Sequence, residues 1–240
     1  MLRLTAKHLF WLKALFHLLG LVPIVYLVLT VVLGRAGGDP VQHIIHYTGI
    51  GALNALAATL LISPIAKLTK QGLLMQTRRL VGLYVFAYAT LHILAFFSLD
   101  LLFAWELLFS EVVKRPYILV GAVAYLIVTA LAITSFKALM RKMGRRWQTL
   151  HNGVYLVAIL APIHFYWSVK SEIIEPSLYI VGFSVLLLWR TPWLKRILSR
   201  KGMSKTVKKT TSGQEKASIK SAYTYGASGE LLACFMFLCA

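Results

Sequence analysis

Six long apolar stretches constrain this chain more than any other feature of its sequence. A helix needs about 20 predominantly apolar residues to cross the hydrocarbon core of a bilayer. The texture of these stretches is helical, without the alternation of a membrane β-barrel. They cover residues 10–33, 49–66, 80–103, 116–136, 148–169 and 177–193. The sequence therefore predicts an all-α, polytopic membrane protein, built as a six-transmembrane-helix bundle.

The composition supports a membrane protein over a soluble one. Hydrophobic residues make up 58% of the chain and charged residues only 14%, whereas about a quarter of an ordinary soluble protein is charged. The two cysteines, Cys234 and Cys239, lie at the C-terminal end, which excludes a disulfide framework in the rest of the chain. We expect one transmembrane domain over residues 1–198 and a basic, disordered tail over 199–240.

The distribution of charge predicts how the spans are oriented. The chain has 26 Lys and Arg residues against 8 Asp and Glu, a net charge of +18. Such an excess indicates nucleic acid or anionic lipid as a partner, and the apolar stretches favour membrane lipid and exclude nucleic acid. Of the 26 basic residues, 22 lie before or early in the first span, in the loops 67–79 and 137–147, or from Arg190 onward. Because positive residues stay on the cytoplasmic side, both termini are predicted to be cytoplasmic.

Histidines are the main ionisable side chains at membrane depth. Acidic and basic residues are nearly absent from the spans, which argues against an ion pump. Neutral imidazole tolerates burial and is the main protein ligand of b-type haem iron. A single membrane histidine is more often a helix–helix hydrogen-bond partner than a ligand, and we favour that role for His17. The four membrane histidines are His17, His92, His151 and His164.

The depth of each histidine indicates which of them could share one iron. The third and fifth spans run in the same direction, each after an Arg-Arg pair. At about 1.5 Å per residue, His92 lies about 20 Å in, His164 about 27 Å and His151 about 8 Å. His92 is therefore closer in level to His164, although helix tilt leaves its pairing with His151 open. On an ideal helix His151 and His164 point about 140° apart, and a kink at Pro162 could change that angle.

A second polar level is predicted nearer the cytoplasm. His17 lies about 6 Å beyond Lys13 and near the level of His151, so the two histidines could form an inner site for a second haem, a flavin or a quinone. At the outer edge, His43 and His46 form an H-x-x-H pattern that we expect to be solvated and free of metal. Four basic side chains that chiefly determine topology could also hold a flavin phosphate or haem propionates. They are Arg78, Arg79, Arg145 and Arg146.

Two long segments around these histidines resemble the ferric-reductase-like transmembrane family. They are TRRLVGLYVFAYATLH (77–92) and GRRWQTLHNGVYLVAILAPIHFYWS (144–168). The segments RLTAKHLFWLKALFHLLGLVP (3–23) and LLISPIAK (60–67) are similar to that family too, specifically to the haem-binding membrane subunits of bacterial periplasmic methionine-sulfoxide reductases. The resemblance covers about residues 1–198.

The resemblance implies cofactors, partner and location. It implies a b-type haem whose iron is ligated by histidines of the third and fifth spans, which carry over to His92, His151 and His164. Related oxidases have a second histidine on the third span where this chain has Glu106. The number of haems, one or two, therefore remains open. The resemblance also implies bound FMN, the bacterial inner membrane, and a periplasmic molybdopterin-containing reductase as partner. That partner repairs oxidised methionine, so we expect an electron-transfer subunit of an oxidoreductase complex with no substrate-reducing site and no catalytic residue of its own.

The source of electrons is a separate question. Related oxidases and ferric reductases carry a cytoplasmic domain for FAD and NAD(P)H, and this sequence has no G-x-G-x-x-G motif. We therefore expect the quinol pool or a cytosolic flavin reductase to be the donor. Two alternatives remain: a ferric or cupric reductase that acts without a dedicated partner, and a cofactor-free transporter or assembly factor that uses the histidines as proton-linked groups.

Overall fold

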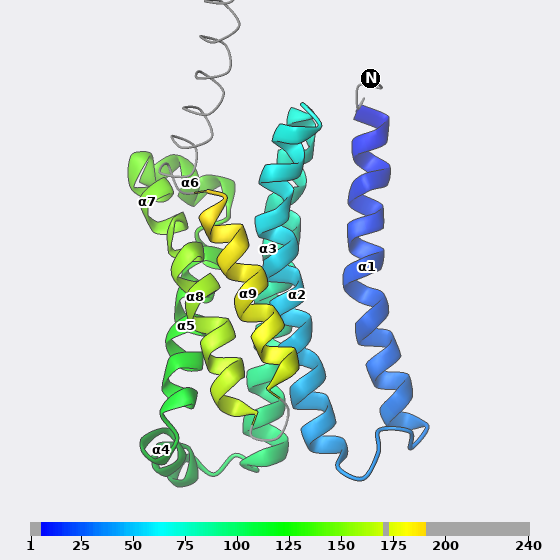
Figure 1. The fold of residues 1–240 in the computed structure, drawn as a ribbon, viewed down its shortest axis with the longest axis vertical. Helices are drawn as coiled ribbons and strands as arrows, with labels where there is room; N and C mark the ends of the chain where they lie inside the picture. Colours follow the sequence, from blue (N-terminus) through cyan, green and yellow to red (C-terminus); the bar gives the residue numbers. More distant parts are fainter. Residues whose placement is uncertain (1–5, 170–172, 191–240) are drawn as a thin grey trace, which may run out of the picture. The chain divides into compact units, whose positions relative to one another are not determined.

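Helices make up nearly all of the chain that the computed structural model describes, which is residues 6–169 and 173–190. Four apolar runs are long enough to cross a membrane (Figure 1). They are α1 (Ala6–Val32), α2 (Pro40–Leu68), the run formed by η1 (Gly72–Thr77), α3 (Arg78–Ala95) and η2 (Phe96–Asp100), and α5 (Pro116–Ile133). The predicted all-α membrane architecture is confirmed, and the protein passes the membrane several times.

The last two predicted spans are shorter in the structure. The fifth is divided into α7 (Arg145–His151) and α8 (Gly153–Ser168), with Asn152 between them. The sixth corresponds to α9 (Ile174–Leu188), an apolar helix of 15 residues. The order of the six apolar segments is as predicted, while four of them reach full span length among the described residues.

Helix α2 begins well before its predicted start at residue 49. Asp39 has extended backbone dihedrals, and its carboxylate accepts a hydrogen bond of 3.0 Å from the backbone N–H of Gln42. Pro40 occupies the first helical position, where its fixed φ angle suits a helix and its missing N–H costs nothing. These signals move His43 and His46 from the predicted loop into the first turns of α2.

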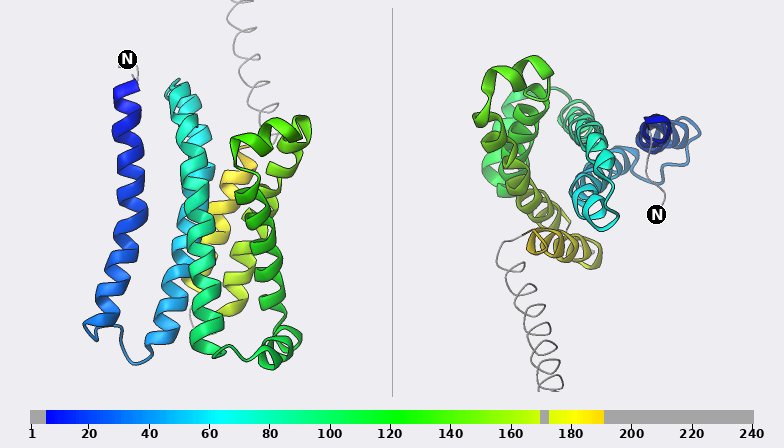
Figure 2. Two further views of the ribbon diagram at one scale, coloured as in Figure 1. Left: turned by 180° about the vertical axis from the view of Figure 1, so that it is seen from behind. Right: turned by 90° about the horizontal axis from the view of Figure 1, so that it is seen from above.

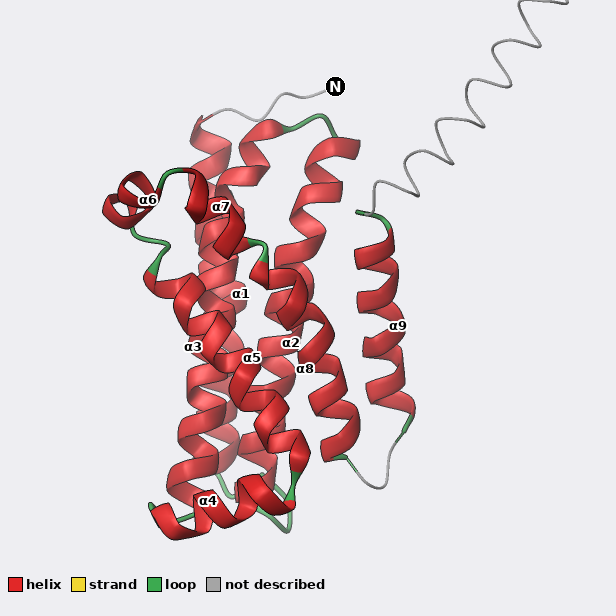
Figure 3. Cartoon of the chain, turned by 90° about the vertical axis from the view of Figure 1, so that its left-hand side faces the viewer, coloured by secondary structure: helices red, strands yellow, loops and turns green. Residues whose placement is uncertain are grey.

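Two short helices stand outside the six predicted spans. α4 (Trp105–Lys114) lies across one end of the bundle (Figure 3), and α6 (Lys137–Met143) lies near the opposite end (Figure 1). Leu102 and Phe103 both have positive φ angles where the chain turns from η2 into α4. α4 is amphipathic, with Glu106 in its first turn and Lys114 in its last turn, and Trp105 and Val113 are exposed on it. This pattern is typical of a helix at a membrane surface.

The core lies between two antiparallel helix pairs. α2 packs along α3, α5 packs along α8, and the pairs meet through α3 with α5 and through α2 with α8. The first helix, α1, stands beside α2 and α3 on the side away from α5 and α8 (Figure 2). The buried cluster consists of Leu53, Leu56, Leu60, Val85, Ala124, Val128, Val157, Ala158, Phe165 and Phe183.

The basic connections share one end of the bundle. The start of α1, the loop containing η1, and the segment with α6 and α7 lie together at the top of Figure 1. The loop after α1 and helix α4 lie at the bottom. We call these the basic end and the opposite end. One compact unit runs to Leu187; the second begins at Leu188, and only 188–190 of it are described. The tail predicted over 199–240 lies outside the described residues.

Candidate functional site

The structure brings the rings of His92 and His164 together between the two helix pairs. His92 projects from α3 and His164 from α8, and both are partly buried. Their ring centres are 6.2 Å apart, and their ring planes are nearly perpendicular, at 87°. This is the pairing that the depth argument favoured.

Each of these imidazoles is fixed by a backbone carbonyl on the neighbouring helix. Nδ1 of His92 lies 2.8 Å from the carbonyl oxygen of Ile45 on α2. Nδ1 of His164 lies 2.7 Å from the carbonyl oxygen of Tyr117 on α5. A carbonyl can only accept, so each Nδ1 carries the proton and donates it. In that tautomer Nε2 has the free lone pair, which is how histidine is held when it ligates a metal.

The spacing of the two rings fits a shared iron. Two imidazoles that bind one iron from opposite sides, with nitrogens about 2 Å from the metal, have ring centres about 6 Å apart. The observed separation of the His92 and His164 ring centres is 6.2 Å. Both the separation and the tautomers therefore suit two axial ligands of one haem. No cluster of three or more metal-binding side chains occurs among the described residues.

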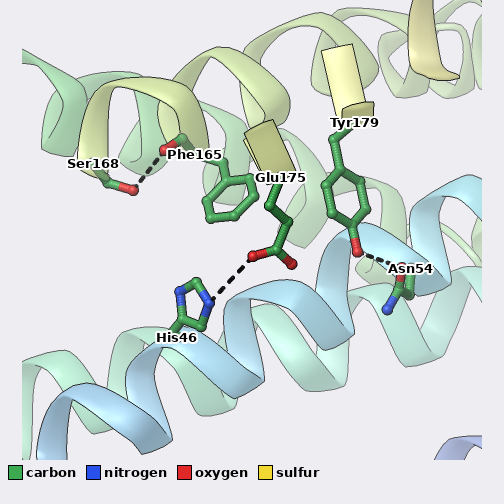
Figure 4. Close-up of polar contacts among 6 residues, drawn as sticks. All are labelled: His46, Asn54, Phe165, Ser168, Glu175 and Tyr179. Atoms are coloured by element: carbon green, nitrogen blue, oxygen red, sulfur yellow. Dashed lines mark hydrogen bonds and ion pairs between the residues drawn. The ribbon is translucent and has the colours of Figure 1, made fainter. Parts of the chain in front are cut away.

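Helix α9 closes the site on the side of α2 (Figure 4). Nε2 of His46 lies 3.8 Å from a carboxylate oxygen of Glu175, and the His46 ring also contacts the ring of Phe165. Further along the helix, the Tyr179 hydroxyl donates to the side-chain oxygen of Asn54 at 2.8 Å. Because Phe165 directly follows His164 in α8, these contacts join α2, α8 and α9 around the histidine pair.

The other half of the H-x-x-H pattern has a different setting. His43 lies next to Tyr47 with ring centres 6.0 Å apart. Its Nε2 atom is buried and has no hydrogen-bond partner in the described part of the chain. The two histidines of the pattern therefore do not act together: His46 turns to α9, while His43 packs on its own helix.

The inner histidines do not meet in the structure. Nδ1 of His17 on α1 lies 2.9 Å from the hydroxyl of Tyr84 on α3. His151, at the end of α7, places Nε2 3.1 Å from the hydroxyl of Thr134 at the end of α5. Each of the two histidines thus joins its own helix to a different neighbour.

The tautomer of His151 is the reverse of that in the outer pair. The Thr134 hydroxyl donates its proton to the carbonyl of Ala130 at 2.7 Å. It must then accept from His151, so Nε2 of His151 carries the proton. The other face of the ring is covered by Trp147, stacked with ring centres 4.0 Å apart. Nε2, which is free in His92 and His164, is therefore hydrogen-bonded in His151.

The divided fifth span explains how His151 and His164 both face α5. On an unbroken helix they would point far apart, but Asn152 separates α7 from α8. His151 bonds to Thr134 at one end of α5, and His164 bonds to Tyr117 at the other. The sequence analysis allowed for a kink at Pro162, and this residue lies inside α8.

The four predicted arginines lie at the starts of α3 and α7. Arg78 is partly buried, while Arg79, Arg145 and Arg146 are exposed. Arg78 lies near enough to His151 for its charge to act on that ring. The basic end therefore offers cationic side chains beside the inner histidine, as a bound phosphate or propionate requires.

The sequence analysis missed the groups that orient the outer imidazoles. Two of them are the backbone carbonyls of Ile45 and Tyr117, which no side-chain pattern reveals. The others are Gly49 and Gly121, which lie against the rings of His92 and His164. The equal spacing between each glycine and its histidine is a signal that could have revealed them.

Comparison with known proteins places these residues in a family. Residues 48–162 match the family described as ferric reductase like transmembrane component. That stretch includes His92 and His151 and ends just before His164. The chain is also 52% identical over 196 residues to the protein-methionine-sulfoxide reductase heme-binding subunit MsrQ of Cronobacter sakazakii (strain ATCC BAA-894). The alignment covers 81% of this chain and 98% of that relative.

Proposed function

Because the chain belongs to the ferric-reductase-like transmembrane family, we propose that it is the membrane-embedded b-type haem subunit of a protein-methionine-sulfoxide reductase system. Its role is to carry electrons across the membrane to a reductase partner. The observation that carries the proposal is the His92–His164 pair, with ring centres 6.2 Å apart and both Nδ1 atoms bonded to carbonyls. The name of the 52% identical relative supports the haem and the reductase system.

The residues around the pair have distinct tasks in this proposal. His92 and His164 would hold the haem iron through their free Nε2 atoms. The carbonyls of Ile45 and Tyr117 keep Nδ1 protonated and the rings oriented. Core residues of the two helix pairs exclude water and lower the local dielectric constant. When bound, the haem supplies one-electron redox chemistry between its ferric and ferrous states.

Electrons enter at the basic end in this proposal. FMN is held there by the arginines at the starts of α3 and α7, which suit its phosphate, with Arg78 beside His151. The quinol pool or a cytosolic flavin reductase is the donor. We expect one haem per chain, because Nε2 of His151, the nitrogen that His92 and His164 leave free, is hydrogen-bonded to Thr134. A stoichiometry of two haems would assign His151 to an inner iron.

The partner acts at the opposite end. The basic connections lie together at one end of the bundle, which supports a cytoplasmic basic end and cytoplasmic termini in the bacterial inner membrane. The His92–His164 pair lies toward the opposite end, because it bonds to residues near the starts of α2 and α5. From there electrons pass to a periplasmic molybdopterin-containing reductase that repairs oxidised methionine, and this chain needs no substrate-reducing site.

The test uses the full chain, purified in detergent. Dithionite reduction should give the sharp α band of a six-coordinate b-type haem, and pyridine haemochrome and flavin assays should count the cofactors. The reduced protein should then be reoxidised rapidly by the periplasmic reductase in the presence of methionine sulfoxide. A colourless, fully folded preparation would refute the proposal.

Two controls separate the rival functions. A ferric or cupric reductase would pass electrons to ferric or cupric chelate faster than to the reductase partner, so the two reoxidation rates distinguish it. His17→Ala is the matched variant for His92→Ala, because His17 is also a histidine at membrane depth, yet among the described residues it bonds only to Tyr84. A transporter or assembly factor predicts that neither variant changes any absorption band.

A further inference from the structure

The two outer histidines have matching surroundings in the two helix pairs. His92 donates to a carbonyl 47 residues earlier in the chain, and His164 does the same. One turn beyond each carbonyl lies a glycine that touches the ring, Gly49 for His92 and Gly121 for His164. Each member of one set lies 72 residues before its counterpart: 45 and 117, 49 and 121, 92 and 164.

The glycines allow this close approach because they lack a Cβ atom. A Cβ atom at Gly121 would lie 2.7 Å from both Cε1 and Nδ1 of His164. That separation is well inside van der Waals contact, and the ring cannot retreat while Nδ1 stays bonded to Tyr117. A Cβ atom at Gly49 would lie 3.2 Å from the ring of His92, so a shift of a few tenths of an ångström would accommodate it.

The orientation of the rings has a spectroscopic consequence. When two axial imidazoles are parallel, both donate π electrons into the same one of two iron d orbitals, so the energies of these two orbitals differ. Perpendicular rings act on both orbitals equally and leave them nearly degenerate, which makes the low-spin ferric EPR signal highly anisotropic. The ring planes of His92 and His164 lie at 87°, and groups that hydrogen-bond a ligand histidine commonly set its orientation.

We propose that Gly49 and Gly121 are positioning residues: they let α2 and α5 come close enough for the carbonyls of Ile45 and Tyr117 to hold the two axial imidazoles perpendicular. The inference rests on the proposed ligation of haem by His92 and His164. It adds that the angle between the rings is built into the helix pairs, with the tighter constraint at Gly121.

EPR spectroscopy of the oxidised full-length protein in detergent tests this inference. The low-spin ferric signal that disappears in His164→Ala is assigned to this pair. In the unaltered protein, the largest g value of that signal should lie well above that of bis-histidine haems with parallel rings. Gly121→Ala should move that g value toward the parallel-ring value or abolish the low-spin signal. Gly49→Ala should shift it in the same direction by less, and it remains informative if Gly121→Ala fails to fold.

Gly82→Ala is the matched control. Gly82 lies in α3, the helix that carries His92, and a Cβ atom there meets nothing within 4 Å. It reproduces the gain in helix propensity of a Gly→Ala change without pressing on a ring, and its spectrum should be that of the unaltered protein. An unchanged spectrum in Gly121→Ala, or weak anisotropy in the unaltered protein, overturns the positioning role. Absence of haem from the unaltered protein overturns the ligation itself.

Discussion

The outer and inner histidines of this protein are used in opposite ways. His92 and His164 bond through Nδ1 to carbonyls and turn toward each other. His17 and His151 bond to hydroxyl side chains of different helices. All four fall within the predicted apolar stretches of the sequence, so that pattern alone does not distinguish them. The chemical nature of the hydrogen-bond partner does, because a carbonyl fixes the proton and leaves Nε2 free, while a hydroxyl can accept as well as donate.

The comparison separates redox chemistry from helix packing. In the outer pair, the rings of His92 on α3 and His164 on α8 lie together with no hydrogen bond between them and with Nε2 left free in each. The inner histidines join helices directly, through hydrogen bonds that need no cofactor. We therefore expect changes at the outer level to act on haem and changes at the inner level to act on stability.

The largest expected effect is at the outer level. His92→Ala should abolish the low-spin haem, because α3 carries no second histidine in its described residues to replace it. The check is the reduced-minus-oxidised spectrum together with the haem-to-protein ratio. His151→Ala is the inner counterpart and should keep the α band of the outer haem.

The haem content of either variant can contradict this distinction between the outer and inner histidines. A normal low-spin spectrum in His92→Ala would show that the outer pair does not ligate the iron. Loss of all haem in His151→Ala would show that the inner level is part of the haem site. A loss of half the haem in His151→Ala, from a starting ratio of two, would assign it a haem of its own.

A smaller effect is expected at the hydroxyl that bonds to His151. Thr134→Val keeps the shape of the side chain and removes its hydroxyl, so the proton on Nε2 of His151 loses its acceptor. An unpartnered buried donor costs about 1–3 kcal/mol. Because this contact is part-buried, the loss should lie at the lower end of that range and lower the thermal midpoint by a few degrees. Thermal unfolding in detergent measures this. The control is Thr129→Val, whose hydroxyl bonds only within α5 in the part of the chain that the structure describes. A gain or loss of haem in Thr134→Val would contradict a purely structural His151.

The contact between α1 and α3 should matter less still. Tyr84→Phe removes the hydroxyl that bonds to His17 while keeping the ring that packs against Gly20. Hydrogen bonds between membrane helices contribute about 0.6 kcal/mol on average, so the expected loss of stability is of that order. The same unfolding assay serves, with the haem spectrum as an internal check. A marked loss of haem would place His17 or Tyr84 in a cofactor site.

The sequence was informative about the spans and about which outer histidines meet. Runs of apolar residues are long, so helix existence survives small errors at each end, and depth along a helix follows from residue count. His92 and His164 were favoured as a pair on depth alone, and the structure places their rings together. The same reasoning put His17 near His151, but in the structure these two histidines do not meet. Depth was not sufficient here, because it says nothing about which helices are neighbours.

Other features depend on local chemistry that the apolar pattern hides. α4 was missed because its ten residues are too few for a span, although their two-faced pattern is typical of a surface helix. The division of the fifth span at Asn152 was not predicted, and Pro162, where a kink was considered, lies inside α8. A proline in a membrane helix can remain inside it when neighbouring helices support the backbone. The carbonyls of Ile45 and Tyr117 carry no sequence signal at all.

The smallest expected effect lies in the tail. Removing residues 203–240 should leave the haem content and the α band unchanged, because every histidine and arginine assigned a role lies upstream of residue 190. The truncated and full-length proteins should be compared at equal protein concentration in the same detergent, with the haem-to-protein ratio as the readout. The basic tail adds to the positive charge of its side of the membrane, so an inverted or poorly inserted product would still fit the outer haem assignment. A correctly inserted, folded truncation without haem would not, since it would require a ligand or a structural support that the His92–His164 pair does not include.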